Sequence, residues 1–449
     1  MADTIAAIAT APATGAIAII RLSGDDALTI AQKVFGGKIT KTRMMHYGEF
    51  IVSGDVIDNG LAAYMKAPNS YTGEDTVEFF CHGSLVVARA ILEELYKNGA
   101  RPAKAGEFTR RAFLNGKLEL SQAEAVIDLI DAETVEGAKS AASQMAGRMG
   151  EKINSVRYTL LDLVSSFYAY VDYPDEDIED TKIGEMVDRL REAEEKLTQM
   201  IDSFEDGKII KDGVRCAIIG RPNAGKSSLL NAILGYERSI VSNIPGTTRD
   251  TVEERVRFGG VSLRLIDTAG IRKSEDAIEK IGIERTESAI DEAQLVLAVF
   301  DGSEELTPED MRIAEYAKSK KLIAVVNKED IAICIDMARL KEFFGENICV
   351  ISAKNESGIE DLSKMVASLF WGIEINTSGE VVTNARHVSA IMRARENVKN
   401  ATDALGMGYP PDVAISDLEN AINALGEITG ETASEQILTR IFERFCVGK

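Results

Sequence analysis

A glycine-rich segment in the middle of the chain constrains the fold more than any other feature. The residues GRPNAGKS (220–227) follow the apolar run VRCAII and precede the helical run SLLNAILG. In this setting the glycines let successive backbone amides point inward, and the helix N-terminus adds positive partial charge. Lys226 can then reach terminal phosphates, and Ser227 can offer its hydroxyl to Mg²⁺. The sequence therefore predicts an α/β unit that binds a nucleoside triphosphate.

The apolar runs after residue 213 predict the rest of this unit. They are apolar on both faces, alternate with helical patterns, and read VRCAIIG, VSLRLIDTAG, LVLAVFD, LIAVVNK and ICVISAK. Such runs are typical of a parallel sheet covered by helices on both sides. We expect this unit to span residues 211–371.

The flanking regions have different periodicities. Residues 1–118 mix short apolar runs with one helical pattern that ends at Gly99, which predicts an α+β domain. Residues 119–210 and 372–449 carry apolar residues at helical spacing, and Ser121 with Glu124 suggests a capping box at the first helix. We therefore expect one discontinuous helical domain that receives the α/β unit as an insertion.

Charge and cysteine content limit the partners and the compartment. The 449 residues include 51 basic and 72 acidic side chains, a net charge of −21, so the chain as a whole repels nucleic acid and anionic lipid. Any RNA must be met by a local patch or by another subunit. Five widely separated cysteines without metal spacing favour a reducing, cytoplasmic location. No apolar run approaches the length of a membrane span, so we expect no membrane contact.

Three further motifs specify the nucleotide. DTAG (267–270) ends an apolar run, where Asp267 can hold Mg²⁺ through water and Gly270 can donate its amide to the γ-phosphate. NKED (327–330) and SAK (352–354) end two later runs. Asp330 can accept two hydrogen bonds from the edge of guanine, whereas adenine lacks those donors. The ordered set predicts GTP as the substrate.

The switch segments leave the catalytic groups open. In GTTRD (246–250), Thr248 is the favoured Mg²⁺ ligand and Thr247 the second choice. Ile271 follows DTAG, where Ras-type proteins have a glutamine that orients water. The alternatives for that role are Glu275, Asp276 and Glu279, each of which could instead be an exposed charge.

Asn223, inside the glycine-rich segment, offers a neutral carbonyl oxygen suited to a monovalent cation. The same asparagine could simply shape the turn. No arginine is obviously placed as an internal finger.

Taken together, GRPNAGKSSLLN, PGTTRDTVEE, DTAGIR with IEKIGIERT, NKED and the final FCVGK resemble the MnmE (TrmE) family of tRNA modification GTPases. YTGEDTVEFFCHG (71–83) and GEFTRRAFLNGKLELSQAEAV (106–126) extend the resemblance to the N-terminal half. Ala105 and Val447 stand where the family usually has proline and isoleucine, which removes no functional group.

The resemblance implies a fold and a reaction. Residues 1–118 would bind a formyl-tetrahydrofolate or related one-carbon folate and form a homodimer, and the inserted unit would be a Ras-like GTPase domain. With an FAD-dependent partner of the MnmG type, in a heterotetramer, the family installs an aminomethyl or carboxymethylaminomethyl group at C5 of wobble uridine 34 in tRNA. We expect tRNA to be bound largely through the partner.

The resemblance also implies site residues. The folate contacts would be Arg21, Glu78, Lys117 and Lys449; without it, Arg21 and Glu78 could be a structural ion pair. A K⁺ site would use Asn223, Ser242, Ile244 and Thr247, in place of an arginine finger. Glu279 would position the water, so the catalytic residues would be Glu279, Lys226 and Cys446. Cys446 could equally be a buried small residue.

The residues expected to contact GTP come from the five nucleotide segments. They are Asn223, Ala224, Gly225, Lys226, Ser227, Ser228, Ser242, Asn243, Ile244, Pro245, Gly246, Thr247, Thr248, Asp267, Thr268, Ala269, Gly270, Asn327, Lys328, Asp330, Ser352, Ala353 and Lys354.

The alternative function is a GTP-switched ribosome-assembly factor. Such a protein would carry a basic RNA-binding module, and the region after residue 371 has neither a GXXG loop with basic flanks nor an excess of basic residues.

Overall fold

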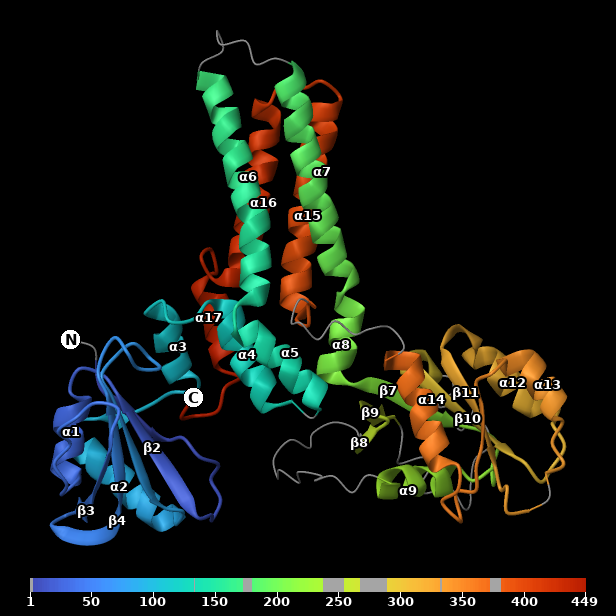
Figure 1. Ribbon diagram of the computed structural model, residues 1–449, viewed down its shortest axis with the longest axis horizontal. Helices are drawn as coiled ribbons and strands as arrows, with labels where there is room; N and C mark the ends of the chain where they lie inside the picture. Colours follow the sequence, from blue (N-terminus) through green and yellow to red (C-terminus); the bar gives the residue numbers. More distant parts are fainter. Residues whose placement is uncertain are drawn as a thin grey trace. The chain divides into compact units, whose positions relative to one another are not determined.

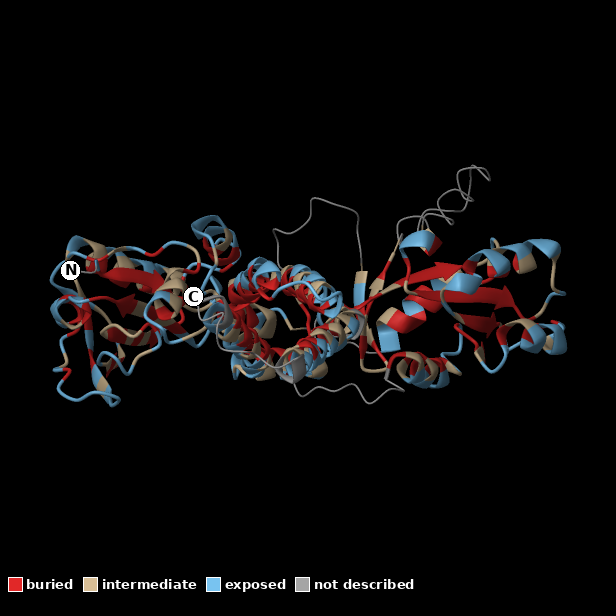
Figure 2. Cartoon of the chain, turned by 90° about the horizontal axis from the view of Figure 1, so that it is seen from above, coloured by how far each residue is buried: buried red, intermediate tan, exposed pale blue. Residues whose placement is uncertain are grey.

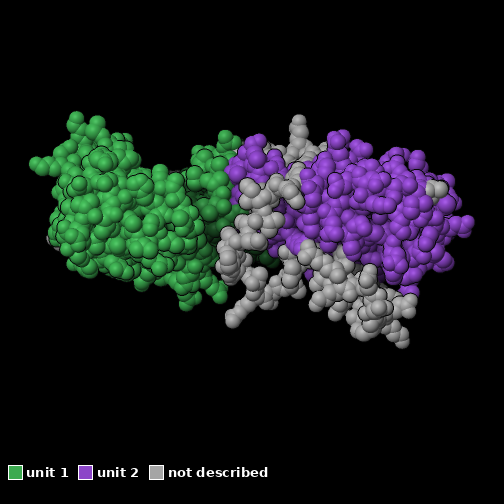
Figure 3. All heavy atoms as spheres, turned by 90° about the horizontal axis from the view of Figure 1, so that it is seen from below, with its two compact units in different colours: residues 1–131, 141–202, 385–449 green, residues 132–140, 203–384 purple. Residues whose placement is uncertain are grey.

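The computed structural model describes residues 3–132, 134–172, 180–236, 254–266, 289–331, 333–371 and 381–449. The chain divides into two compact units (Figure 3). The first unit contains residues 1–131, 141–202 and 385–449, and the second contains residues 132–140 and 203–384. Within the described ranges, no helix combines the length and the apolarity needed to cross a membrane.

The first unit begins with a six-stranded sheet of order β3-β4-β5-β2-β1-β6. Its strands are β1 (Ile5–Ile8), β2 (Ile17–Ser23), β3 (Met45–Val52), β4 (Asp55–Met65), β5 (Thr76–His82) and β6 (Arg101–Pro102). β1 and β6 are parallel, and the other neighbours are antiparallel. The apolar start of the chain thus forms β1 and β2.

Alternation along β1 explains how this sheet is covered. Ala6 packs in the core beneath α1 (Ala27–Val34) and α2 (Leu85–Lys97), whereas Ile5 and Ala7 face the other way and pack with Phe108 of α3 (Glu107–Leu114). The sheet therefore has one broad helical cover and a second contact with α3. This second contact is next to the candidate site described below.

Four long helices form the bundle of the first unit: α6 (Arg148–Asp172), α7 (Asp180–Asp202), α15 (Ala385–Gly406) and α16 (Asp412–Thr429) (Figure 1). Their buried residues recur at helical spacing, for example Val388, Ile391, Val398 and Leu405 in α15. Seen from above, the buried residues lie on the inner side of the helices (Figure 2). The predicted helical stripes are therefore core positions.

Shorter helices connect the bundle to the sheet. They are α4 (Leu120–Ile130) and α17 (Glu435–Phe442), whereas α5 (Val135–Met145) is divided between the two units. The predicted capping box at Ser121 is wrong. The N-cap is Glu119, whose backbone N–H donates to Oε1 of Gln122 at 2.8 Å, because the carboxylate of Glu124 is engaged inside the protein instead.

The second unit contains a six-stranded sheet of order β12-β11-β10-β7-β9-β8, in which only the β8–β9 pair is antiparallel. The strands are β7 (Val214–Ile219), β8 (Glu254–Phe258), β9 (Val261–Leu265), β10 (Leu295–Asp301), β11 (Lys321–Asn327) and β12 (Ile348–Val350). The helices are α8 (Phe204–Asp212), α9 (Lys226–Tyr236), α12 (Pro308–Tyr316), the short η1 (Ala317–Ser319), α13 (Met337–Phe344) and α14 (Ile359–Trp371).

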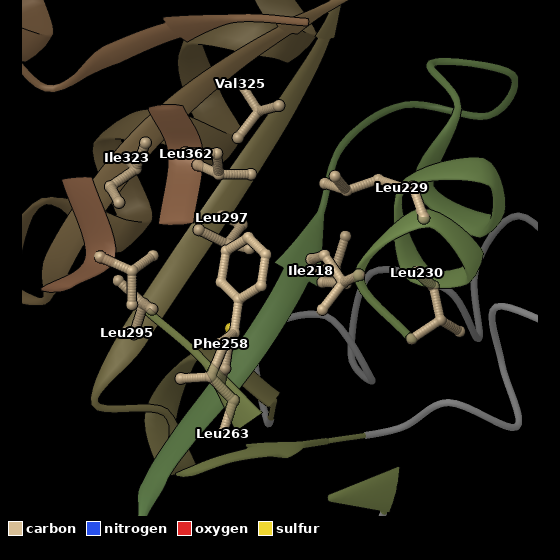
Figure 4. Packing of buried hydrophobic residues seen from close by; sticks show 14 of the residues in the cluster. Ile218, Leu229, Leu230, Phe258, Leu263, Leu295, Leu297, Ile323, Val325 and Leu362 are labelled. Atoms are coloured by element: carbon tan, nitrogen blue, oxygen red, sulfur yellow. The ribbon is translucent and has the colours of Figure 1, made fainter. Parts of the chain in front are cut away.

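Both faces of this sheet are buried. Ile218 of β7 packs with Leu229 of α9 and Leu362 of α14, as Figure 4 shows, whereas Ala217 faces the core made with α12 and α13. Continuous apolar runs are required because neither face meets water. The multidomain α+β and α/β fold is therefore confirmed, and the exact boundaries at 118, 210 and 371 stay predictions.

Candidate functional site

The predicted nucleotide motifs meet at one edge of the second unit's sheet. Residues 220–227 follow β7, residues 327–330 include the end of β11, and residues 352–354 follow β12. These strands are parallel to one another through β10, so their carboxyl ends lie at the same edge. This edge is where ligands bind in open α/β sheets.

The backbone of the glycine-rich loop has the geometry of an anion cradle. Gly220, Asn223 and Gly225 have φ values of 148°, 63° and 96°. A Cβ on Gly220 would lie 2.3 Å from the carbonyl oxygen of Val299, and a Cβ on Gly225 would lie 2.0 Å from Nδ2 of Asn327. Larger residues at these two glycines would thus push the loop away from the sheet, and asparagine tolerates the left-handed region at position 223.

Lys226 is held inside this loop by backbone carbonyls. Its Nζ donates to the oxygens of Gly220 and Arg221, each at 2.7 Å. Burial lowers the pKa of Lys226, and the charge of Glu309 acts in the opposite direction. An ammonium has three N–H donors, so a third remains to be directed at a phosphate oxygen.

Asn327 joins three of the motifs through one buried amide. Its Nδ2 donates to the carbonyl oxygen of Ala224 at 3.1 Å, and its Oδ1 accepts from the backbone N–H of Ala353 at 3.0 Å. The side chain is 3% exposed, so both ends of the amide need partners. The sequence marked Asn327 only as a GTP contact and missed this linking role, although an asparagine that ends a buried strand is a signal for it.

Asp330 is oriented by the neighbouring motif. Oγ of Ser352 donates to Oδ1 of Asp330 at 2.8 Å and accepts from the backbone N–H of Asn355 at 3.2 Å. Asp330 itself is exposed at the sheet edge. The serine of SAK therefore fixes the carboxylate that the sequence assigned to guanine.

Lys328 and Asp301 form an ion pair beside this carboxylate. Burial alone would raise the pKa of Asp301, but hydrogen bonds from Lys328 and Ser303 outweigh it and lower the pKa. Lys354, which the sequence also assigned to GTP, is exposed. The pair keeps the Lys328 side chain at the edge where the base is expected.

Arg221 is engaged away from the loop centre. Its Nε lies 2.9 Å from Oδ1 of Asp310, and its Nη2 lies 3.1 Å from Oε2 of Glu304. Two carboxylates therefore hold this guanidinium away from the centre of the loop.

Several predicted residues fall outside the described part of the chain. They are Ser242, Asn243, Ile244, Pro245, Gly246, Thr247, Thr248, Asp267, Thr268, Ala269, Gly270 and Glu279. Ser227 and Ser228 lie in the first turn of α9 and, like Asn223, are exposed. Among the described ranges, no group of three His, Cys, Asp or Glu side chains could hold a metal ion.

A second candidate site lies on the N-terminal sheet. Arg21 of β2 is paired in register with Glu78 of β5, and its Nε donates to Oε1 of Glu78 at 2.7 Å. The guanidinium carbon lies 5.6 Å from the ring centroid of Tyr71 and 5.7 Å from that of Phe108. Burial raises the pKa of Tyr71, which keeps its phenol neutral. Arg21 thus combines an ion pair with two aromatic contacts.

The last residues of the chain reach this cluster. Nη1 of Arg21 donates to the carbonyl oxygen of Gly448 at 3.4 Å, and the backbone N–H of Phe108 donates to that of Lys449 at 3.2 Å. Gly448 has φ 102°, and a Cβ there would lie 2.4 Å from the carbonyl oxygen of Ile8. The tail therefore lies against the end of β1 and needs glycine to do so.

The other two predicted residues of this region are Lys117 and Cys446. Lys117 donates from Nζ to the carbonyl oxygen of Pro68 at 3.0 Å and lines a cavity of about 590 Å³ together with Glu74 and Asn115. Cys446 is a free, exposed cysteine, so the alternative of a buried small residue is wrong. The structure brings Arg21, Glu78 and the tail together.

Sequence reasoning missed Tyr71 and Phe108 as neighbours of Arg21. Both lie in segments that carry the family resemblance, YTGEDTVEFFCHG and GEFTRRAF, which was the available signal. Their side chains could be placed only by the packing of α3 and the 71–76 segment against β2.

Two family models match the chain: "GTP-binding protein TrmE N-terminus" over residues 4–117 and "MnmE helical domain" over residues 120–446. The tRNA modification GTPase MnmE of Thermoanaerobacter pseudethanolicus is 44% identical over 457 residues, which cover 100% of this chain and 99% of that protein. The proteins of the same name from Alkaliphilus metalliredigens and Clostridioides difficile are each 42% identical, with the same coverage. Matches over the whole length show the family, and with it GTP hydrolysis. The chain belongs to the MnmE family of tRNA modification GTPases.

Proposed function

We propose that the chain is a K⁺-dependent GTP hydrolase that acts with an MnmG-like FAD protein to install an aminomethyl or carboxymethylaminomethyl group at C5 of tRNA uridine 34. A one-carbon tetrahydrofolate would supply carbon. The observation that carries the GTP part is the buried Asn327 amide, which fixes the phosphate loop against the base-binding motifs. In this proposal residues 1–118 bind folate and form the homodimer, and residues 119–210 and 372–449 form the helical domain around the GTPase domain at 211–371.

The described residues fit a guanine nucleotide. The loop amides between Gly220 and Lys226 would hold the phosphates, and Lys226 would add a charged donor. Asp330, oriented by Ser352, would accept from the guanine N1–H and amine. Mg²⁺, when bound, supplies charge neutralisation on the phosphates, and we assign Ser227 and Thr248 as the residues that hold it.

The K⁺ requirement rests on what surrounds Asn223. The residue is exposed in the loop with a positive φ, so its side-chain carbonyl can reach outward, while Arg221 is engaged by Asp310 and Glu304. K⁺ would supply the positive charge that an arginine finger supplies elsewhere. Asn223 with Ser242, Ile244 and Thr247 would hold it, and Glu279 would orient the attacking water.

The folate part of the proposal rests on the cluster around Arg21. Glu78 offers a carboxylate, Tyr71 and Phe108 offer aromatic surface, and the tail adds the terminal lysine. The Lys117 cavity beside Glu74 gives additional room, since Glu74 also accepts a hydrogen bond from Ser23 of β2 at 2.7 Å. Cys446 would supply a thiol near the same site.

The charge balance supports a division of labour with partners. A chain of net charge −21 meets tRNA poorly by itself, so the FAD protein would provide most of the tRNA surface. We place the complex in the cytoplasm.

Reconstitution tests the whole proposal. The purified chain, an MnmG-like FAD protein, unmodified tRNA, GTP, K⁺ and formyl-tetrahydrofolate would be incubated together, and nucleosides would be analysed by mass spectrometry. We expect modified uridine 34 only with the complete mixture, and none when Lys226→Ala replaces the parent chain. Equal modification with ATP in place of GTP, or without the FAD protein, contradicts the proposal.

A further inference from the structure

A buried charged cluster in the first unit has no part in either site described above. Nε and Nη2 of Arg386 lie 3.0 and 2.6 Å from the two carboxylate oxygens of Glu124, and Nε2 of His387 lies 2.7 Å from Oε2 of the same carboxylate. His387 is 1% exposed and Glu124 is 8% exposed. We call Glu124, Arg386 and His387 the ionic node.

Burial of such a node needs an explanation other than stability. Desolvation of buried charges offsets most of their attraction, so an apolar cluster of similar volume would stabilise the bundle at least as well. A bidentate arginine–carboxylate pair fixes the orientation of one side chain relative to the other, because the two planar groups form both hydrogen bonds in only one geometry. The node is therefore suited to fixing the relative positions of the elements that carry it.

Those elements lead to the C-terminal tail. Nη1 of Arg386 also donates to the carbonyl oxygen of Glu427 at 2.6 Å, and Nη2 donates to that of Ile428 at 3.5 Å, so the arginine closes the C-terminal end of α16. α16 ends at Gly430 with φ 99°, where a Cβ would lie 2.6 Å from the ring of Phe113. The chain then enters α17 and the tail.

The same helix that carries Glu124 supports α17. An apolar cluster joins α4 to α17 and the residue that precedes the tail; its buried members are Leu120, Ala123, Leu438, Ile441, Phe442 and Phe445. Beyond it, the tail contacts Gly106, Phe108 and Arg21 through backbone groups. One continuous set of contacts thus runs from the ionic node to the Arg21 cluster.

The node also sits at a covalent junction. Arg386 and His387 lie in the first turn of α15, directly after residue 384, the last residue of the second unit. The chain that returns from the second unit therefore enters the first unit at the node. A shift of this first turn would be transmitted to the end of α16.

We propose that Glu124, Arg386 and His387 are positioning residues that set the place of the C-terminal tail over Arg21. The inference rests on the proposed folate function only for its effect on affinity; the placement of the tail stands on the contacts themselves. It predicts that loss of the node frees the tail without removing GTP hydrolysis by the second unit.

A nitroxide on Cys446 provides the test. In a Cys334→Ala background the remaining cysteines, Cys81, Cys216 and Cys349, are buried, so the label reports on the tail alone. We expect an immobilised spectrum in this background and a mobile component in Glu124→Gln and Arg386→Gln, with GTP hydrolysis unchanged. Folate affinity should fall about tenfold in both variants.

The matched control is Arg393→Gln. Arg393 of α15 pairs with Glu427 of α16 at 2.6 Å, but the side chain of Arg393 is 50% exposed. The Arg393→Gln variant should therefore leave the label on the tail immobile. If node variants melt at lower temperature while the label stays as immobile as in Arg393→Gln, the node is merely structural and the proposal is overturned.

A conservative variant keeps the test decisive if the glutamine variants fail to fold. Glu124→Asp retains the charge but shortens the side chain, so bidentate contact is lost; a mobile tail supports the proposal, and an immobile one overturns it. The two proposals can fail separately. If the parent chain binds no folate, the proposed folate function is wrong. If the node variants nevertheless show a mobile tail, the positioning role is still supported.

Discussion

The nucleotide site and the Arg21 cluster are built in opposite ways. The first gathers loops at the carboxyl edge of one parallel sheet, and much of its chemistry is backbone: the amides of the glycine loop and the carbonyls that hold Lys226. The second combines side chains of two antiparallel strands with Phe108 of α3 and the end of the chain. Local sequence specifies the first, whereas packing of distant segments specifies the second.

This difference predicts how each site responds to change. A site at a sheet edge should lose binding sharply when one specific side chain changes, while the rest of the chain is unaffected. A site assembled from distant segments should respond to changes in the supports of those segments.

Asp330→Asn should have the largest effect. It exchanges a carboxylate acceptor for an amide, so GTP affinity should fall about 1,000-fold because two charge-assisted hydrogen bonds are lost. Xanthosine triphosphate should bind better than in the parent. The neighbouring Glu329→Gln is the control, and calorimetry is the measurement; equal GTP affinity in both variants would remove Asp330 from base recognition.

Glu124→Gln tests the supports of the distant site. Burial alone would raise the pKa of Glu124, but His387 and Arg386 lower it to about 2 from an ordinary value of 4.5. A depressed carboxyl pKa stabilises the fold above pH 4.5, and this contribution is lost as the pH falls toward 2. Removing the carboxylate leaves the Arg386 guanidinium without this partner, so the variant should lose about 3 kcal/mol of the free energy of unfolding at pH 7.

The measurement is urea unfolding followed by helical circular dichroism between pH 7 and pH 2. At pH 7 the free energy of unfolding of Glu124→Gln should be lower than that of the parent, and it should decrease less as the pH falls. Glu427→Gln, which changes the partly exposed partner of Arg393, should keep the parent's pH dependence. If both variants give the same slope, the depressed pKa of Glu124 does not contribute to acid stability.

Glu279→Ala should slow GTP turnover about 100-fold, because loss of a group that orients the attacking water acts on the transition state. GTP affinity should stay at the parent's value. Stopped-flow binding and single-turnover hydrolysis separate the two effects. Normal turnover would mean that another residue orients the attacking water, and Glu275 and Asp276 would be tested next.

Replacing K⁺ by Na⁺ at equal ionic strength should slow hydrolysis about 30-fold, if one charge-stabilising contact depends on the cation. Asn223→Ala should hydrolyse GTP at the same low rate in both salts. Steady-state phosphate release measures this. Equal rates of the parent in K⁺ and Na⁺ would end the proposed cation role.

Gly448→Ala should have the smallest effect and the most selective one. Its Cβ would meet the carbonyl oxygen of Ile8 and its φ of 102° is unfavourable, so the tail should leave Arg21 and folate affinity should fall about tenfold. GTP hydrolysis should not change. Val447→Ala, at an exposed position, is the control; unchanged folate affinity in Gly448→Ala would separate the tail from the site.

The sequence predicted the α/β unit accurately for a physical reason. Strands buried on both faces must be continuously apolar, and a loop that wraps phosphate must have glycine where a Cβ would meet the sheet, as at Gly225. Both constraints act within a few residues, so they can be recognised in the amino-acid sequence. The capping box at Ser121 failed because Glu124 contacts Arg386, 262 residues away, instead of its own helix.

By itself the sequence determined the order of the domains, the nucleotide motifs and the family, because each depends on short contiguous patterns. Tertiary structure alone decided that Asn327 links three motifs, that Tyr71 and Phe108 lie beside Arg21, and which backbone groups hold the tail there. These contacts join residues that are far apart in the chain. Their partners are chosen by the packing of whole elements, which no local pattern encodes.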